Sequence, residues 1–86
     1  MIKVKYTSKF AKAFKRLPKN IQNRAVKKIE IFQSNPYTPS LKTHKLSGNL
    51  EAFHAFAINH QYKILFKFEN EKGIVLLNVG THSIYR

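Results

Sequence analysis

The sequence contains no cysteine, no tryptophan and no aspartate, and only three glycines among its 86 residues. Without cysteine, the chain has neither a disulfide framework nor a thiolate metal site. No apolar run approaches the roughly 18–20 residues of a membrane-spanning helix, and the first ten residues lack the apolar segment of a signal peptide. We therefore expect a small cytoplasmic protein that forms a single domain over residues 1–86.

Acidic residues are also scarce. Four glutamates stand against sixteen lysines and arginines, which gives a formal net charge of +12. Such an excess favours a polyanionic partner, with nucleic acid as the first candidate, an anionic membrane surface as the second and an acidic protein as the third. A merely solvated surface is the alternative, but natural surfaces of that kind usually interleave both signs.

Hydrophobic periodicity in the first half of the chain predicts one strand and two helices. Residues 1–6 alternate between apolar and basic side chains, which is typical of a half-buried strand. Helical spacing then predicts a hairpin of helices over residues 8–34, begun by a cap at Thr7 or Ser8 and interrupted at Pro18. The apolar faces of these helices comprise Phe10, Phe14 and Leu17, followed by Ile21, Ala25, Ile29 and Phe32.

After Gly48 the apolar period changes to two. Strands are expected near residues 52–58, 61–68 and 74–80, with a turn at 69–73. The predicted fold is therefore α+β, in the order β-α-α-β-β-β. In this fold the helical hairpin covers one face of an antiparallel sheet, and the N-terminal strand at residues 1–6 is expected to pair in the same sheet. The other face is expected to be open and to carry Lys63 and Lys67.

Two histidines could converge on that open face. His82 follows the last strand and could reach over the sheet, and His44 precedes the first of the late strands. Two histidines that converge near a lysine would supply a proton acceptor, a proton donor and a cation, which are the groups needed to cleave RNA through its own 2′-hydroxyl. His54 alternates with apolar residues and His60 lies in a turn, so structural and solvated roles are expected for them. No metal-ligand set stands out.

Four segments in order resemble the RelE/ParE superfamily of bacterial type II toxins, most closely the RelE- and YafQ-like mRNA interferases. They are "KYTSKFAKAFKRLP" at the start, "LKTHKLSGNLEAF", "INHQYKILF" and the terminal "VGTHSIYR". The second is similar to a Leu-x-x-His-x-Leu-x-Gly turn, and the last to a Gly-x-His-x-x-x-aromatic ending. The resemblance covers nearly the whole chain.

The resemblance implies an endoribonuclease that needs no metal or other cofactor. Such toxins enter the ribosomal A site, cut the mRNA there, and are held inactive by a cognate antitoxin. The implied partners are thus an antitoxin, ribosomal RNA and mRNA, with no membrane and no small-molecule cofactor. Carried over onto matching positions, His44 and His82 would perform acid–base chemistry, Lys63 would stabilise the phosphate, and Tyr85 would stack on a base. Which histidine is the acid stays open, with His82 favoured.

The chain departs from the family pattern in the third segment. Lys63 replaces an arginine and loses its bidentate fork, and Ala57 and Gln61 stand where many relatives carry an arginine and an aspartate. Compensating contacts to RNA are expected from Lys42, Lys45, Lys67 or Arg86, and the solvated His60 is a further candidate for contacting RNA. Two alternatives therefore stay open: a ParE-like inhibitor of DNA gyrase on the same fold, and an RNA-binding member whose catalysis is weakened.

Overall fold

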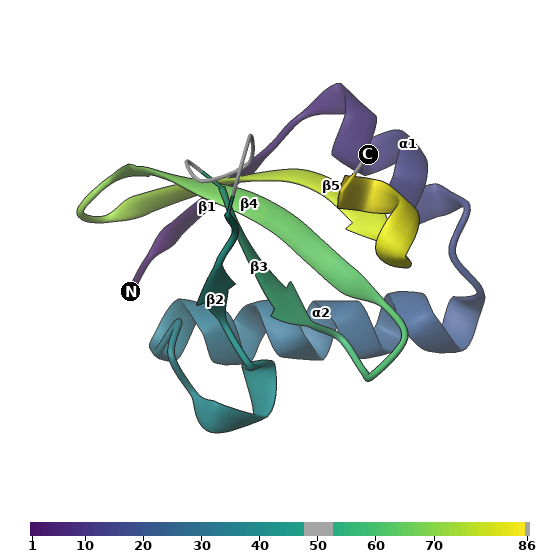
Figure 1. Ribbon diagram of the computed structural model, residues 1–86, viewed down its shortest axis with the longest axis horizontal. Coiled ribbons are helices and arrows are strands. Elements are labelled where there is room, and N and C mark those ends of the chain that lie inside the picture. Colours follow the sequence, from purple (N-terminus) through teal and green to yellow (C-terminus); the bar gives the residue numbers. More distant parts are fainter. Residues whose placement is uncertain (48–52, 86) are drawn as a thin grey trace.

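The computed structural model of the protein describes residues 1–47 and 53–85. The α+β fold and the order of its elements agree with the sequence-based expectation (Figure 1). The elements are β1 (Lys3–Tyr6), α1 (Ser8–Lys15), α2 (Lys19–Ser34), the 3₁₀ helix η1 (Pro39–Leu41), β2 (His44–Lys45), β3 (His54–Ala57), β4 (Lys63–Asn70), β5 (Gly73–Gly80) and the 3₁₀ helix η3 (His82–Tyr85).

The five strands form one sheet in the order β1-β5-β4-β3-β2. The expectation of an antiparallel sheet is wrong at one edge, because β1 pairs with β5 in parallel, with Val4 beside Ile74. A parallel pair needs a long crossover, and here the whole chain between β1 and β5 supplies it, which local periodicity does not encode. At the other edge, His44 and Lys45 form a two-residue strand on β3 where a polar turn was one interpretation.

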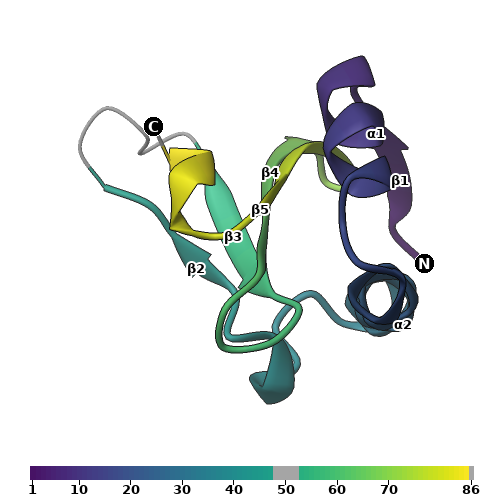
Figure 2. The ribbon, with the colours of Figure 1, turned by 90° about the vertical axis from the view of Figure 1, so that its right-hand side faces the viewer.

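Local sequence signals explain where the helices begin. The side-chain oxygen of Thr7 accepts the backbone N–H of Phe10 at 3.0 Å and caps α1. The Thr7 hydroxyl also donates to the carbonyl of Leu77 at 3.2 Å, which ties the start of α1 to β5. Pro18 occupies the cap position of α2, where its missing N–H costs nothing. Both helices lie on the same side of the sheet (Figure 2).

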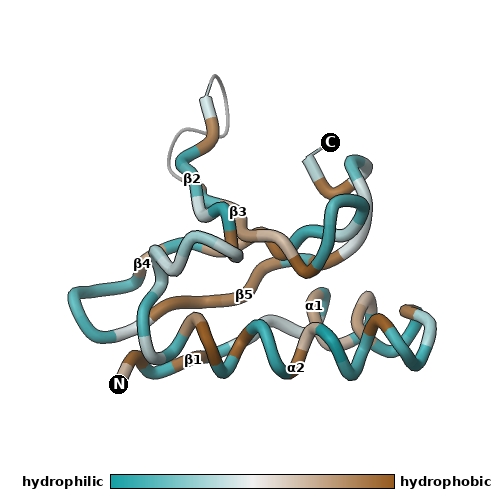
Figure 3. Tube along the Cα trace, turned by 90° about the horizontal axis from the view of Figure 1, so that it is seen from below, coloured by the Kyte–Doolittle hydropathy of each residue, from teal (hydrophilic) through white to brown (hydrophobic). Residues whose placement is uncertain are grey.

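The core lies between α2 and the sheet. Phe32 stacks on Phe56 with ring centroids 4.6 Å apart and meets the ring of Phe66 edge-on at 4.9 Å, and all three side chains are fully buried. Burial of each such ring stabilises the fold by about 1.5–3 kcal/mol. Apolar residues run along most of β5, whereas α2 alternates between apolar and polar (Figure 3), as expected for a central strand and a surface helix.

The second face of the sheet is not fully open as expected. The 3₁₀ helix η3 lies on it, against β4 and β5, on the side opposite α2 (Figure 2). Ile84 of η3 is only 6% exposed. Three residues whose side chains project from this face of the sheet, Ala55, Ala57 and Leu65, are also buried. The last turn of the chain thus covers the middle of the face and leaves Lys63 and Lys67 at its margins. Within the described residues, no helix is long and apolar enough to cross a membrane.

Candidate active site

The Lys63 ammonium is held by the turn that precedes β4. Its Nζ donates to the backbone carbonyls of Asn59, at 2.9 Å, and His60, at 3.1 Å. An ammonium has three donors, so one remains for a ligand. Burial, and secondarily the positive charge of Lys42, lower the pKa of Lys63. Lys63 is therefore a partly desolvated cation with a fixed direction.

Asn59 shapes this turn, although it is not among the site residues predicted from the sequence. Its side-chain oxygen accepts the backbone N–H groups of Gln61, at 2.9 Å, and Tyr62, at 2.7 Å. The turn thereby presents two carbonyls to Lys63. An asparagine between two strands is an ordinary turn signal. The sequence of this turn does not indicate, however, that the side chain of Lys63 folds back over the turn.

His44 has a defined tautomer. Its Nδ1 lies 2.9 Å from the carbonyl oxygen of Lys42, which only accepts hydrogen bonds, so in the neutral ring Nδ1 carries the proton. The exposed Nε2 is then a free proton acceptor. Lys42 adopts a left-handed conformation, with φ of 51°, and this places its carbonyl under the histidine. His44 is therefore suited to be a general base.

His82 and Tyr85 stand side by side on η3. Their ring centroids are 5.7 Å apart and their planes meet at 73°. Residues three apart eclipse one another in a 3₁₀ helix, which explains the contact. His82 is exposed and Tyr85 is half-buried, and burial raises the pKa of the Tyr85 phenol so that it stays protonated near neutral pH.

The strand register brings these groups to one face. His44 pairs with Ala55, and Lys63 pairs with Ala57 on one side and Gly80 on the other. From strand and residue spacings, the Cα atoms of His44 and Lys63 lie about 12 Å apart, which leaves room for a phosphate between the two side chains. His82 comes two residues after the register partner of Lys63. No carboxylate in the described ranges forms an ion pair with Lys63 or His44.

His54 lies on the opposite, helix-covered side. Its ring is 4.9 Å from that of Phe68 and 5.5 Å from that of Phe66, and its Nδ1 is buried without a hydrogen-bond partner in the described structure. Burial lowers its pKa, and the positive charges of Lys45 and His44 lower it further. The packing role expected for His54 agrees with this position.

The residues proposed to contact RNA do not form one surface. Lys42 and His60 border the Lys63 ammonium, and Lys67 is exposed on the same face of β4. Lys45 pairs with His54 and therefore points to the other side of the sheet from its neighbour His44. Arg86 lies outside the described residues.

Comparison with known proteins adds the fold family. No protein-family model matches the chain, and no curated sequence matches it either. Among solved structures, YafQ from E. coli strain BL21(DE3) aligns with a TM-score of 0.80 at 17% identity, covering 99% of this chain and 98% of that one. A chain of the YoeB–YefM complex from Staphylococcus aureus aligns at 0.76 and 15% identity, covering 95% and 98%. A chain of the toxin–antitoxin complex RelBE2 from Mycobacterium tuberculosis aligns at 0.72 and 18% identity, covering 94% and 98%.

The chain has the fold of the RelE/ParE toxins. The resemblance read from the four sequence segments is thus confirmed for the fold. Within this RelE-like fold, the roles of His44, Lys63, His82 and Tyr85 rest on the geometry of the face they share.

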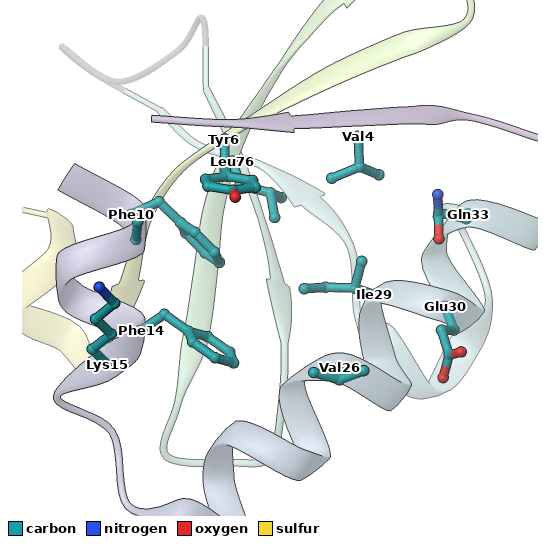
Figure 4. A pocket seen from close by; sticks show the side chains of 11 residues that line it. Val4, Tyr6, Phe10, Phe14, Lys15, Val26, Ile29, Glu30, Gln33 and Leu76 are labelled. Carbon is teal, nitrogen blue, oxygen red and sulfur yellow. The ribbon is translucent and has the colours of Figure 1, made fainter. Parts of the chain in front are cut away.

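A separate, apolar groove lies on the helix side of the RelE-like fold (Figure 4). It encloses about 490 Å³ between β1, α1 and α2. Tyr6 and Val26 line the groove, and the exposed fractions of these residues are 66% and 49%. Phe10 and Phe14 form the wall of the groove on α1. Exposed apolar side chains that line a common groove are typical of a protein-binding surface.

Proposed function

We propose that this protein is the toxin of a type II toxin–antitoxin module and an endoribonuclease that cuts mRNA in the ribosomal A site. Two findings support the proposal: the RelE-like fold, and a sheet face that carries two histidines and a partly desolvated lysine. The strongest support for this function is the fixed ammonium of Lys63. A cation held by two carbonyl oxygens is preorganised to bind the negative charge that develops on a phosphate.

The reaction is a transesterification that consumes no water. Nε2 of His44 takes the proton of a 2′-hydroxyl, and that oxygen forms a bond to the adjacent phosphorus. The bond from phosphorus to the 5′ oxygen breaks, and protonated His82 gives its proton to this leaving oxygen. The products are a 2′,3′-cyclic phosphate and a 5′-hydroxyl, and Lys63 stabilises the charge on the phosphate oxygens meanwhile.

The test is primer extension on mRNA in a translating extract. The proposal expects cuts at a fixed position within the codon in the A site, and 2′,3′-cyclic phosphate ends on the products. A substrate with a deoxynucleotide at the cut position should be resistant, because it lacks the attacking oxygen. Intact mRNA together with inhibition of DNA gyrase would contradict the proposal and favour the ParE-like alternative.

The partner proposed for the apolar groove is the antitoxin. Chains of two toxin–antitoxin complexes share this fold, and a +12 protein favours a partner rich in acidic residues. An amphipathic antitoxin helix would place its apolar face against Tyr6, Phe14 and Val26 (Figure 4).

The groove assignment is tested by copurification with the product of the neighbouring reading frame. Val26→Glu puts a charge into the groove and should abolish copurification, whereas Lys27→Glu, on the next exposed position of α2, should not. Equal copurification of both variants would show that the antitoxin binds elsewhere.

A further inference from the structure

Helix α1 separates two surfaces of opposite character. Phe10 and Phe14 line the apolar groove, whereas Lys9, Lys12 and Arg16 line a second groove. These three residues fall at i, i+3 and i+7, which is one face of a helix, and their cationic stripe covers roughly 10 Å of helix axis. None of the three belongs to the apolar face predicted for this helix from the sequence.

The opposite wall of this second groove comes from the C-terminal end of the chain. Gly80, Thr81 and Ser83 line it, and the groove encloses about 480 Å³. Gly80 is the register partner of Lys63, and Ser83 directly follows His82. The groove, which we call the α1–η3 groove, therefore begins beside the candidate active site, with η3 as the element common to both.

The cations of this groove have no partner of opposite charge in the described structure. The ion pair found among residues 1–47 and 53–85 is Lys5–Glu69, which belongs to β1 and β4. Among the residues that the structure describes, no acidic side chain lines the groove. Like charges three and four residues apart on a helix repel one another, so Lys9, Lys12 and Arg16 would be stabilised by a bound polyanion.

The donors that line this groove fit phosphate oxygens. Lysine and arginine heads with the hydroxyls of Thr81 and Ser83 are the groups that contact nucleic-acid backbone, and such contacts position a strand without reading its sequence. A single strand that passes Lys63 would meet this groove on leaving the candidate site.

We infer that the α1–η3 groove binds the phosphate backbone of the single-stranded RNA segment that continues from the cleaved nucleotide. This inference rests on the proposed ribonuclease function and extends its substrate contacts. The three cations neutralise up to three phosphates, and each contact to a single strand contributes about 0.7 to the slope of log affinity against log salt.

The experiment measures the binding of a fluorescein-labelled 12-nucleotide RNA by fluorescence anisotropy, at salt concentrations from about 50 to about 400 mM. All 2′-hydroxyls of this RNA are methylated, so the proposed reaction cannot consume it. The variant Lys9→Gln/Lys12→Gln/Arg16→Gln should reduce the slope by about 2 and weaken binding roughly 100-fold at 0.1 M salt. Glutamine preserves helix propensity.

The matched control removes the same charge from α2, as Arg24→Gln/Lys27→Gln/Lys28→Gln, because none of these three residues lines the groove. Because screening is strong beyond about 10 Å at 0.1 M salt, this variant should weaken binding only a few-fold. A second pair of variants leaves α1 intact. Ser83→Glu should weaken binding about fivefold and Ser34→Glu should not, since one lost phosphate contact is worth about 0.7 of a decade of affinity at this salt.

Equal losses in the groove and control variants would overturn the inference, and so would tighter binding of a duplex of the same length. Failure of the proposed function has a different signature. In that case the native protein leaves ribosome-bound mRNA intact, while the salt slope still depends on Lys9, Lys12 and Arg16.

Discussion

Replacement of Lys63 separates two contributions of one side chain. In the native protein its Nζ donates to the carbonyls of Asn59 and His60, and its third N–H is available to substrate. Lys63→Met keeps the length of the side chain and removes all three donors. We expect a modest loss of stability and a large loss of cleavage rate.

The two magnitudes differ enough to be distinguished. Hydrogen bonds from a charged donor contribute about 1.5–3 kcal/mol when buried, and because Lys63 is only half-buried, roughly 1–2 kcal/mol of stability is at stake in total. Even a domain stable by about 5 kcal/mol would stay folded after that loss. Removal of a donor to a developing oxyanion lowers the rate about 10²–10³-fold, or about 2.7–4 kcal/mol.

Asn59→Ala is the matched control, because it loosens the same turn without removing the ammonium. The variant loses two hydrogen bonds to the Asn59 side chain, at 2.9 and 2.7 Å, so its melting temperature should fall at least as far as that of Lys63→Met. Its cleavage rate, measured by primer extension on ribosome-bound mRNA, should fall much less. Equal rate losses in the two variants would refute a direct role of Lys63 in binding the phosphate.

The remaining predictions concern the histidines, Tyr85 and η3. His44→Ala and His82→Ala should each lower the cleavage rate about 10²–10⁴-fold, with copurification of the antitoxin unchanged as the check on folding. Tyr85→Phe should be milder than Tyr85→Ala in the same assay, because phenylalanine retains the stacking ring. The lowered pKa of His54 means that the unfolded chain binds its proton at a higher pH than the native protein does, so stability should be lost as pH falls below about 6.5; urea melts at neutral and acidic pH should show this loss in His60→Gln but not in His54→Phe. Gly80→Ala should lower activity by displacing η3, since the added methyl would come within 2.9 Å of the Ile84 Cγ2 atom, and Ile84→Leu, which removes that atom, should restore part of the activity.

Local signals were enough to predict the helices and most of the sheet. The cap was predicted at Thr7 or Ser8, and the structure has it at Thr7. The break at Pro18 and the second helix over residues 19–34 are confirmed, because each depends on neighbours in the sequence. The strand expected at 61–68 instead spans Lys63–Asn70, since the Asn59 turn extends to Tyr62 and the hairpin turn is as short as Glu71–Lys72.

The parallel pairing of β1 with β5 was not predictable in this way. Val4 and Ile74 are seventy residues apart, and an alternating pattern identifies a strand without identifying its partner or its direction. The same limit applies to β2. His44 and Lys45 have the composition of a turn, and they form a strand only because β3 presents a free edge to them.

The candidate site shows where periodicity stops being informative. Strand alternation correctly assigned Lys63 to the face away from the helices, but the direction of its ammonium comes from the carbonyls of a turn. The position of His82 depends on a single buried contact of the terminal segment, because Ile84 anchors η3 where Gly80 has no side chain to obstruct it. Four residues in a 3₁₀ helix carry no hydrophobic period long enough to predict such a contact. The acid proposed for catalysis is therefore held in place by the tertiary packing of η3, which is why substitutions at Gly80 and Ile84 should affect its function more than their place at the end of the chain suggests.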